Sequence, residues 1–445
     1  MASDLLSIAR SGTMAARIAL DVTAQNIANA GTEGYVRRTA RMAEVSSSGG
    51  ICRIGDVSLS GVRLDKVVRN ADLFRQSEVR RTGADAARAD SEVTGLENIE
   101  AAVEQSRVYP AMVDFDGSLQ RLAGDPTDAS LRAGVMEAAR TMAGTFNIAA
   151  QSLNSAASGM QFEATAGVAE VNTLTGELAR VNLRLSRAAD ASSDQSSLLD
   201  QRDSLLQQIS AYADVTTSFS ADGTVALRLG GTNGQDVVLG GSATPLAMTT
   251  ASDGTLSFDV GGNGITLTGG SLAGKQQALV KLADVRTRLD AVADGLMNTV
   301  NTAQTGGSDV YGNPGLPLFS GSGAGGMSLA FSDGSGLATA PAGSGPGSRN
   351  PGNLDALGTA LGAADPTGRM DALIFDISGT VASRKVTKEA LTTIASGAKI
   401  SLEAQAGVDL DQEAVNLMRF QQAFQASGKA MQVASTLFDT LLNLR

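Results

Sequence analysis

Residues 19–42 read ALDVTAQNIANAGTEGYVRRTARM, and this stretch predicts a long helix that ends abruptly. Its first part continues an apolar 3-4 spacing that begins at Leu5, which is the spacing of a coiled-coil seam. Two amide side chains, Asn26 and Asn29, occupy positions on this seam where apolar residues are expected. The spacing therefore predicts a helix over residues 3–30 whose contact face is partly polar.

The residues after this helix predict a hinge followed by strands. Gly31 and Gly34 can adopt the left-handed backbone conformation that ends a helix. Residues 35–45 alternate between apolar and polar side chains, which is typical of a strand. Residues 46–69 continue as a predicted strand pair around a turn at SSSGG. We therefore expect the chain to leave the helix through the glycines and form a small sheet.

Composition excludes several classes of protein. The chain has 445 residues, enough for two to four domains, and its aromatic content of 4 % favours Ala-rich helices over a dense aromatic core. Its net charge of −11 argues against nucleic acid as the main partner. The sequence has no apolar run long enough for membrane insertion, and its first residues do not resemble a Sec-type signal peptide.

The chain also lacks the residue types on which most catalytic sites depend. Histidine is absent, which excludes His-based triads and His-ligated metals. The only cysteine, Cys52, is interpreted as a small residue near a strand. Asp200 and Asp203 are interpreted as an acidic pair on a solvated helix face, and the glycine-rich turns match no phosphate-binding motif. We predict no catalytic residue, no cofactor and no metal.

The middle of the chain alternates between helical and extended patterns. A Gly-, Thr- and Val-rich stretch, residues 215–271, carries Asp-Gly and Asn-Gly turns and predicts an inserted β module. Residues 304–352 are rich in Gly, Ser and Pro and are interpreted as a flexible or surface loop. Helices are predicted at residues 72–108, 128–158, 161–189, 196–211, 272–303, 380–404 and 409–443.

These patterns predict a mainly α fold with inserted β, organised as nested domains. The N- and C-terminal helices can pair as a coiled coil only if the middle of the chain loops out and returns. The predicted domains are a terminal helical domain, a helical-bundle middle domain with β-hairpin elements and a small all-β outer domain. Their respective boundaries are residues 1–42 plus 400–445, residues 43–213 plus 272–399, and residues 214–271.

The apolar stripes of the terminal helices predict an assembly interface. Two helices alone cannot bury both stripes, and each large side chain contributes about 1.5–3 kcal/mol when it is buried. Gly12 and Gly428 permit close helix approach, while Asn26 and Gln421 are polar seam residues that specify register. The predicted interface residues are Leu5, Ile8, Gly12, Ala15, Ile18, Val22, Asn26, Asn29, Tyr35, Arg37, Arg38, Leu410, Leu417, Phe420, Gln421, Phe424, Gly428, Met431, Phe438 and Leu441.

A basic cluster follows the predicted hinge. Arg37, Arg38 and Arg41 stand close together in an otherwise acidic chain. Nucleic-acid binding requires more basic residues and interleaved aromatic side chains. We therefore expect this cluster to form salt bridges with an acidic surface of a partner.

The ends of the chain resemble a known family. SGTMAARIALDVTAQNIANAGTEGYVRR (11–38) resembles the N-terminal signature of the bacterial flagellar rod, hook and hook-associated axial proteins. The last 39 residues or so, beginning GVDLDQEAV at Gly407, resemble the C-terminal helix of that family. Two internal runs, residues 196–215 and 301–321, are similar to the hook-associated subgroup at the junction of hook and filament.

This resemblance implies a structural, non-enzymatic subunit that forms a ring with identical subunits. It further implies contacts with hook protein below, with a second junction protein and flagellin above, and with an export chaperone that binds the C-terminal helix. It also implies export to the extracellular flagellum by the type III apparatus, without a cleaved signal peptide.

Two alternatives are left open by the sequence. One is another axial component, such as a hook or distal rod protein. The other is a secreted glycan-active protein with axial-type ends, which the lack of Trp and Tyr in residues 215–271 disfavours.

Overall fold

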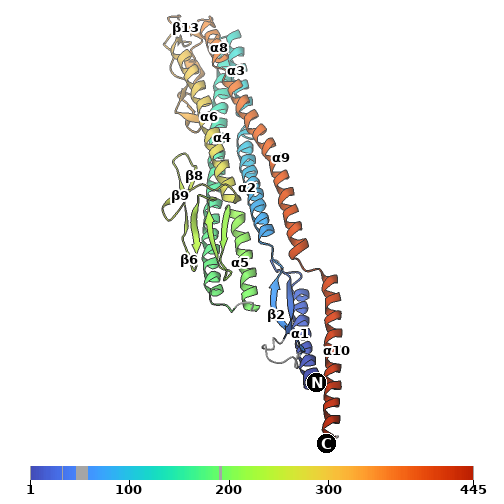
Figure 1. Ribbon diagram of the computed structural model, residues 1–445. Coiled ribbons are helices and arrows are strands. Elements are labelled where there is room, and N and C mark those ends of the chain that lie inside the picture. Colours follow the sequence, from blue (N-terminus) through green and yellow to red (C-terminus); the bar gives the residue numbers. More distant parts are fainter. Residues whose placement is uncertain (1, 33, 47–58, 190–192, 444–445) are drawn as a thin grey trace. The chain divides into compact units, whose positions relative to one another are not determined.

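The computed structural model describes residues 2–32, 34–46, 59–189 and 193–443. It is mainly helical with small antiparallel sheets, as predicted (Figure 1). The chain divides into two compact units, which are described separately. Unit 1 contains residues 1–83, 171–245 and 392–445, and unit 2 contains residues 84–170 and 246–391. None of the described helices has an apolar stretch long enough to cross a membrane.

The two ends of the chain pack together in unit 1. Helix α1 (Ala2–Ala28) lies beside helix α10 (Leu410–Asn443), as Figure 1 shows. The two helices approach each other closely at Gly12, where an added Cβ atom would lie 2.9 Å from Oγ of Ser427. Small residues at such positions let helix backbones approach each other, so Gly12 has a steric role in this pair.

The hinge after α1 leads into a two-stranded sheet. Gly34 has a φ of +79°, the left-handed conformation predicted for it, whereas Gly31 does not adopt a positive φ. Strand β1 (Arg38–Ser46) pairs antiparallel with β2 (Leu59–Arg69). Backbone N–H of Val62 donates to Oγ of Ser11, which ties the sheet to α1. Cys52 and the predicted SSSGG turn lie outside the described residues.

The rest of unit 1 contains a helix and a second sheet. Helix α5 (Ser193–Tyr212) leads into a four-stranded antiparallel sheet of order β3-β4-β5-β6. Asn182, near the end of helix α4 (Ala129–Leu185), donates to the carbonyls of Val225 and Gly240 at 2.8 and 2.9 Å and thereby holds this sheet. The strands are β3 (Val215–Phe219), β4 (Val225–Leu229), β5 (Gln235–Leu239) and β6 (Ser242–Ala243).

Unit 2 is a helical bundle with its own small sheet. Strands β7 (Leu246–Thr250), β8 (Leu256–Val260) and β9 (Asn263–Ile265) form this sheet. The segment predicted as one β module therefore forms two sheets, one in each unit. The bundle combines α3 (Val108–Gly124), α6 (Gly270–Thr305) and α8 (Gly352–Ala364) with parts of α2 (Leu73–Glu104), α4 (Ala129–Leu185) and α9 (Pro366–Ala406).

Two helix predictions differ from the structure. The predicted break near residue 159 is wrong, because α4 is one continuous helix. Buried Leu153, Met160 and Ala164 continue its apolar spacing past Gly159, and this burial outweighs the weak helix propensity of glycine. Helix α9 also begins well before the predicted residue 380.

The interpretation of residues 304–352 as a flexible or surface loop is wrong for residues 307–340, which pack into unit 2, whereas residues 341–350 are mostly exposed. Arg132 is buried and donates to the carbonyls of Gly334 and Leu337 at 3.1 and 2.9 Å. Leu318 and Phe319 are also buried. The short elements here are β10 (Gly307–Ser308), β11 (Phe319–Ser320), α7 (Gly323–Gly326), β12 (Ser328–Leu329), η1 (Gly334–Gly336) and β13 (Ala340–Pro341).

Candidate functional site

Helix α10 carries two apolar faces, of which one contacts α1. Ala434 and Glu413 on the first face are buried against the rest of unit 1. Helical spacing places a second set of apolar side chains on a different face. These are Val415, Met418, Val433 and Leu437, whose exposed fractions are 54 %, 55 %, 60 % and 48 %. We call this set the outer face. It is largely uncovered in the described chain, and Val433 at its edge also borders a groove that Leu5 and Ile8 of α1 line.

The predicted interface residues fall into groups by burial. Ala15, Val22, Asn26 and Arg38 are buried within unit 1. Those of intermediate burial are Ile8, Gly12, Ile18, Asn29, Tyr35, Arg37, Leu417, Phe420, Gly428 and Met431. The exposed residues are Leu5, Leu410, Gln421, Phe424 and Phe438, and Leu441 lies in the last turns of α10.

The sequence prediction did not include the outer face. Its four residues repeat a helical spacing of their own, offset from the stripe that was predicted. Searching α10 for a second periodic apolar set would have found them. Met14 on α1 is similarly exposed and was not predicted.

Asn26 is the centre of a buried polar group at the end of α1. Its Oδ1 atom accepts hydrogen bonds from the hydroxyl of Tyr35 at 2.9 Å and from the backbone N–H of Arg38 at 3.0 Å. Its Nδ2 atom donates to the carbonyl of Arg38 at 2.9 Å and to Oε2 of Glu413 at 3.2 Å. All four hydrogen-bonding positions of the amide are therefore satisfied within one chain.

This geometry changes the role expected of the amides. Asn26 was predicted to specify register on the seam, but its bonds hold the strand β1 and helix α10 against the end of its own α1. Asn29 also bonds locally, since its Nδ2 atom donates to the carbonyl of Gln25 at 2.9 Å. Burial of the Tyr35 hydroxyl raises the pKa of that group. Asn26 and Asn29 therefore fix the conformation of the hinge that follows α1.

The basic cluster meets acidic residues of the same chain, which corrects the expectation of an acidic partner surface. Arg37 Nε lies 2.7 Å from Oε1 of Glu413 on α10. Arg38 Nη2 lies 2.9 Å from Oδ2 of Asp200 on α5. Arg41 is exposed. The acidic surface that these two arginines contact is therefore supplied by the chain itself.

Asp200 and Asp203 form a buried ion-pair cluster, so their interpretation as a solvated pair is wrong. Arg69 Nη2 lies 2.6 Å from Oδ1 of Asp200 and 2.9 Å from Oδ2 of Asp203. Arg202 Nη2 lies 2.6 Å from Oδ1 of Asp203, and its Nη1 atom donates to the carbonyl of Gly223. The cluster thereby connects β1 and β2 to α5 and to the β3–β6 sheet.

The chemistry of this cluster is structural. Guanidinium groups occupy the carboxylate oxygens of both acids, which leaves little access for proton transfer to a substrate. Within the part of the chain that the structure describes, no three His, Cys, Asp or Glu side chains converge to hold a metal. The site that remains is the apolar surface of the terminal helices, positioned by the polar group around Asn26.

Three family models match the chain. The model described as "Flagellar hook-associated protein FlgK helical domain" matches residues 93–319. "Flagella basal body rod protein" matches residues 6–35, and "Flagellar basal body rod FlgEFG protein C-terminal" matches residues 403–444. The two terminal matches cover the helices that pair in unit 1.

Individual relatives agree with these matches. Flagellar hook-associated protein 1 of Bacillus subtilis is 23 % identical over 98 % of this chain and 97 % of its own length. The protein of that name from Salmonella typhimurium is 27 % identical over 72 % of this chain and 59 % of its own length. The flagellar hook junction protein FlgK from Burkholderia pseudomallei, a solved structure, has a TM-score of 0.50 and 25 % identity over 55 % of this chain and 46 % of its own.

Proposed function

Because the chain belongs to the flagellar hook-associated protein FlgK family, it is a structural component of the hook–filament junction, and we propose that it self-assembles through its terminal helices. The match of the helical domain confirms the predicted hook-associated subgroup. It favours the junction over the alternatives of a hook or distal rod position. The relatives are named as flagellar hook-associated or hook junction proteins, and the proposed role requires no catalysis.

The outer face of α10 is the observation that carries this proposal. Four large apolar side chains there are about half exposed in the single chain. Burying such side chains contributes roughly 1.5–3 kcal/mol each when they are removed fully from water, so a covering partner would gain substantial free energy. A neighbouring subunit of the same kind supplies a matching apolar helix surface and allows the contact to repeat around a ring.

The polar group around Asn26 supports the proposal by fixing the geometry of this surface. Glu413 binds both Asn26 and Arg37, so α10 is held at its N-terminal end against α1 and the β1 strand. A helix pair held in this way presents its outer face in a defined direction. This arrangement reduces the conformational entropy that each subunit loses on assembly.

The partners that we propose follow from the place of the family in the flagellum. They are identical subunits in a ring, hook protein below, and a second junction protein with flagellin above. An export chaperone would cover the outer face of α10 before export, because its four apolar side chains are about half exposed. The net charge of −11 disfavours nucleic acid, and we propose an extracellular location reached without a cleaved signal peptide.

A charge-matched pair of variants tests the proposal. Met418→Asp with Val433→Asp places two carboxylates on the outer face, whereas Gln425→Asp with Gln432→Asp places them on exposed polar positions of the same helix. The first variant is expected to lose self-association in sedimentation velocity and attachment to purified hook ends, while its far-UV circular dichroism stays unchanged. Equal assembly of both variants would refute a role for the outer face.

A further inference from the structure

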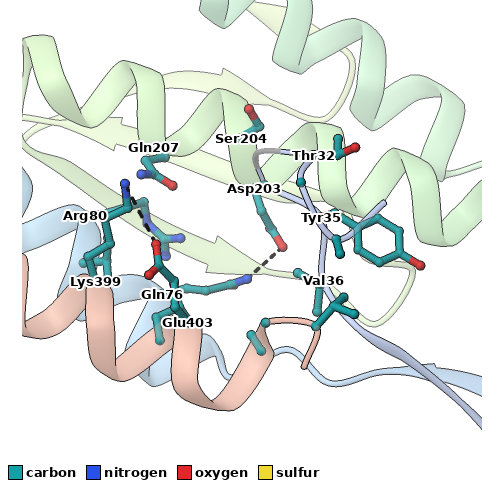
Figure 2. Close-up of a pocket in the computed structure, with 18 residues that line it drawn as sticks. Thr32, Tyr35, Val36, Gln76, Arg80, Asp203, Ser204, Gln207, Lys399 and Glu403 are labelled. Atoms are coloured by element: carbon teal, nitrogen blue, oxygen red, sulfur yellow. Dashed lines mark hydrogen bonds and ion pairs between the residues drawn. The ribbon is translucent and has the colours of Figure 1, made fainter. Parts of the chain in front are cut away.

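A cavity of about 350 Å³ lies in unit 1, apart from the outer face of α10. Figure 2 shows Thr32, Tyr35 and Val36 of the hinge on one side of it. Gln76 and Arg80 of α2 contribute to another side, together with α5 and the last turns of α9. Its lining also includes residues 406–408, which lead from α9 into α10. Both chain segments that connect to the terminal helices therefore border this cavity.

Arg80 is the unusual side chain of the cavity. It is only 4 % exposed, and its Nη2 atom has no hydrogen-bond partner within the described residues. Burial lowers the pKa of its guanidinium, and the nearby Arg202 acts in the same direction. Asp203 lies close enough to interact electrostatically, but its oxygens accept from Arg69, Arg202 and Gln76.

Among the described residues, the α5 cluster beside the cavity holds more guanidinium groups than carboxylates. Four guanidinium groups, those of Arg38, Arg69, Arg80 and Arg202, face the two carboxylates of the α5 cluster. A buried cation without a partner is costly, and buried polar atoms are nearly always satisfied. Among the described residues, Nη2 of Arg80 therefore has no hydrogen-bond acceptor, and an anion would meet this need best.

A second cation stands at the edge of the cavity. Lys399 is exposed, and its Nζ atom lies 4.0 Å from Oε1 of Glu403. Figure 2 shows Lys399 and Arg80 on the same side of the cavity. A ligand oxygen bound by Arg80 would thus lie near another positive group. The carboxylates of Glu403 and Asp203 also border the site and would repel a phosphate dianion, which favours a monoanion.

We propose that this cavity is a carboxylate-binding site, in which Arg80 donates from Nη2 to the ligand and Lys399 adds a second positive charge. Guanidinium–carboxylate bonds are among the strongest hydrogen bonds in proteins. Oε1 of Gln76, which also has no partner in the described chain, accepts from an N–H or O–H group beside the carboxylate. An acidic residue within a peptide offers both of these groups.

Two sources can supply this carboxylate. One source is an acidic side chain of a second copy, which would bind between the hinge after α1 and residues 406–408 as the subunits assemble. This source rests on the proposed self-assembly. A free small carboxylate is the other source. Binding of the carboxylate itself can be measured on the single chain and does not depend on assembly.

The first measurement uses sodium acetate as the probe. Thermal unfolding of the dilute full chain is followed in sodium acetate and in sodium chloride at equal ionic strength. Relative to chloride, acetate is expected to raise the Tm of the parent and, by the same amount, the Tm of the exposed control Lys429→Gln. It should raise the Tm of Lys399→Gln by less and leave the Tm of Arg80→Gln unchanged. If Arg80→Gln does not fold, the test compares the acetate-induced Tm shift of Lys399→Gln with that of Lys429→Gln. An equal Tm in both salts for the parent, or an equal acetate effect in all variants, overturns the proposal.

The second measurement distinguishes the sources by following self-assembly in the same two salts. If the parent assembles more slowly in acetate, while Arg80→Gln assembles slowly in both salts, the ligand is an acidic side chain of a second copy. Unchanged assembly together with the Arg80-dependent Tm shift indicates a free carboxylate. A chain that shows this shift but never assembles refutes the proposed function and still supports the carboxylate site.

Discussion

Nδ2 of Asn26 donates a hydrogen bond of 3.2 Å to Oε2 of Glu413, a residue 387 positions further along the chain. Both side chains are buried, and Arg37 completes the contact from the segment between the hinge and β1. A buried amide–carboxylate contact therefore joins the two ends of the chain. Its removal should loosen the terminal helix pair without affecting the core of unit 2.

Asn26→Ala is expected to destabilise unit 1 by roughly 2–5 kcal/mol, because several buried groups lose their partner at once. The groups concerned belong to Tyr35, Arg38 and Glu413. Hydrogen exchange of the α1 amides measures this change. Asn29→Ala is the control, since it removes only local bonds and should cost less than about 1 kcal/mol. Equal exchange rates in the two variants would contradict the central role of Asn26.

Gly12→Val should separate α1 from α10. The added side chain would overlap Ser427, and overpacking of this kind typically costs about 1–3 kcal/mol. Gly428→Ala is the matched change on α10, where an added Cβ meets nothing within 4 Å. This variant should be neutral or more stable by up to about 1 kcal/mol, because alanine favours helix. Thermal unfolding monitored by circular dichroism compares the two, and a more stable Gly12→Val chain would rule out the close contact.

Asp203→Asn should be strongly destabilising. It removes a buried charge that binds Arg69 and Arg202, and breaking a buried pair in this way costs about 3–5 kcal/mol. Asp236→Asn removes the partner of Arg228 in an exposed pair of the same unit and should cost about 1 kcal/mol or less. Urea unfolding provides both free energies. Similar values for the two variants would show that the α5 cluster behaves like a surface ion pair.

The stability of unit 2 should fall in acid in part because of Asp376. Hydrogen bonds from Lys281 and then Arg288 lower the pKa of this carboxyl group. A carboxyl whose folded-state pKa is depressed stabilises the fold above its unfolded pKa of about 4, and this stabilisation is lost as the pH falls through the folded-state value.

Asp376→Asn should therefore lower the free energy of unfolding at pH 7 and have no such effect well below the folded-state pKa. The side chain is 42 % exposed, so solvent screening limits the expected difference to about 0.5–1 kcal/mol. Urea unfolding of the parent and the variant at several pH values measures it, and added salt should reduce it at pH 7. A difference that persists in strong acid would exclude the ion pairs as its cause.

Much of the local structure could be predicted because it depends on nearby residues. The apolar spacing predicted both terminal helices, and the alternation after Tyr35 predicted β1. Gly34 adopts the predicted left-handed conformation. Residues 158–161 show the limit of such reasoning, because burial on both sides of Gly159 keeps α4 one helix where two were predicted.

The sequence by itself determined the helix faces, the hinge and the absence of histidine chemistry, since these follow from residue type and spacing. Only the tertiary structure decided that Arg38 meets Asp200 and that Asn26 meets Glu413. Such partners come from segments far apart in the sequence, and the sequence does not distinguish which acidic residue each arginine or amide will contact. The tertiary structure also decided which face of α10 is covered by α1, because the spacing of residues identifies an apolar face but not the element that packs against it.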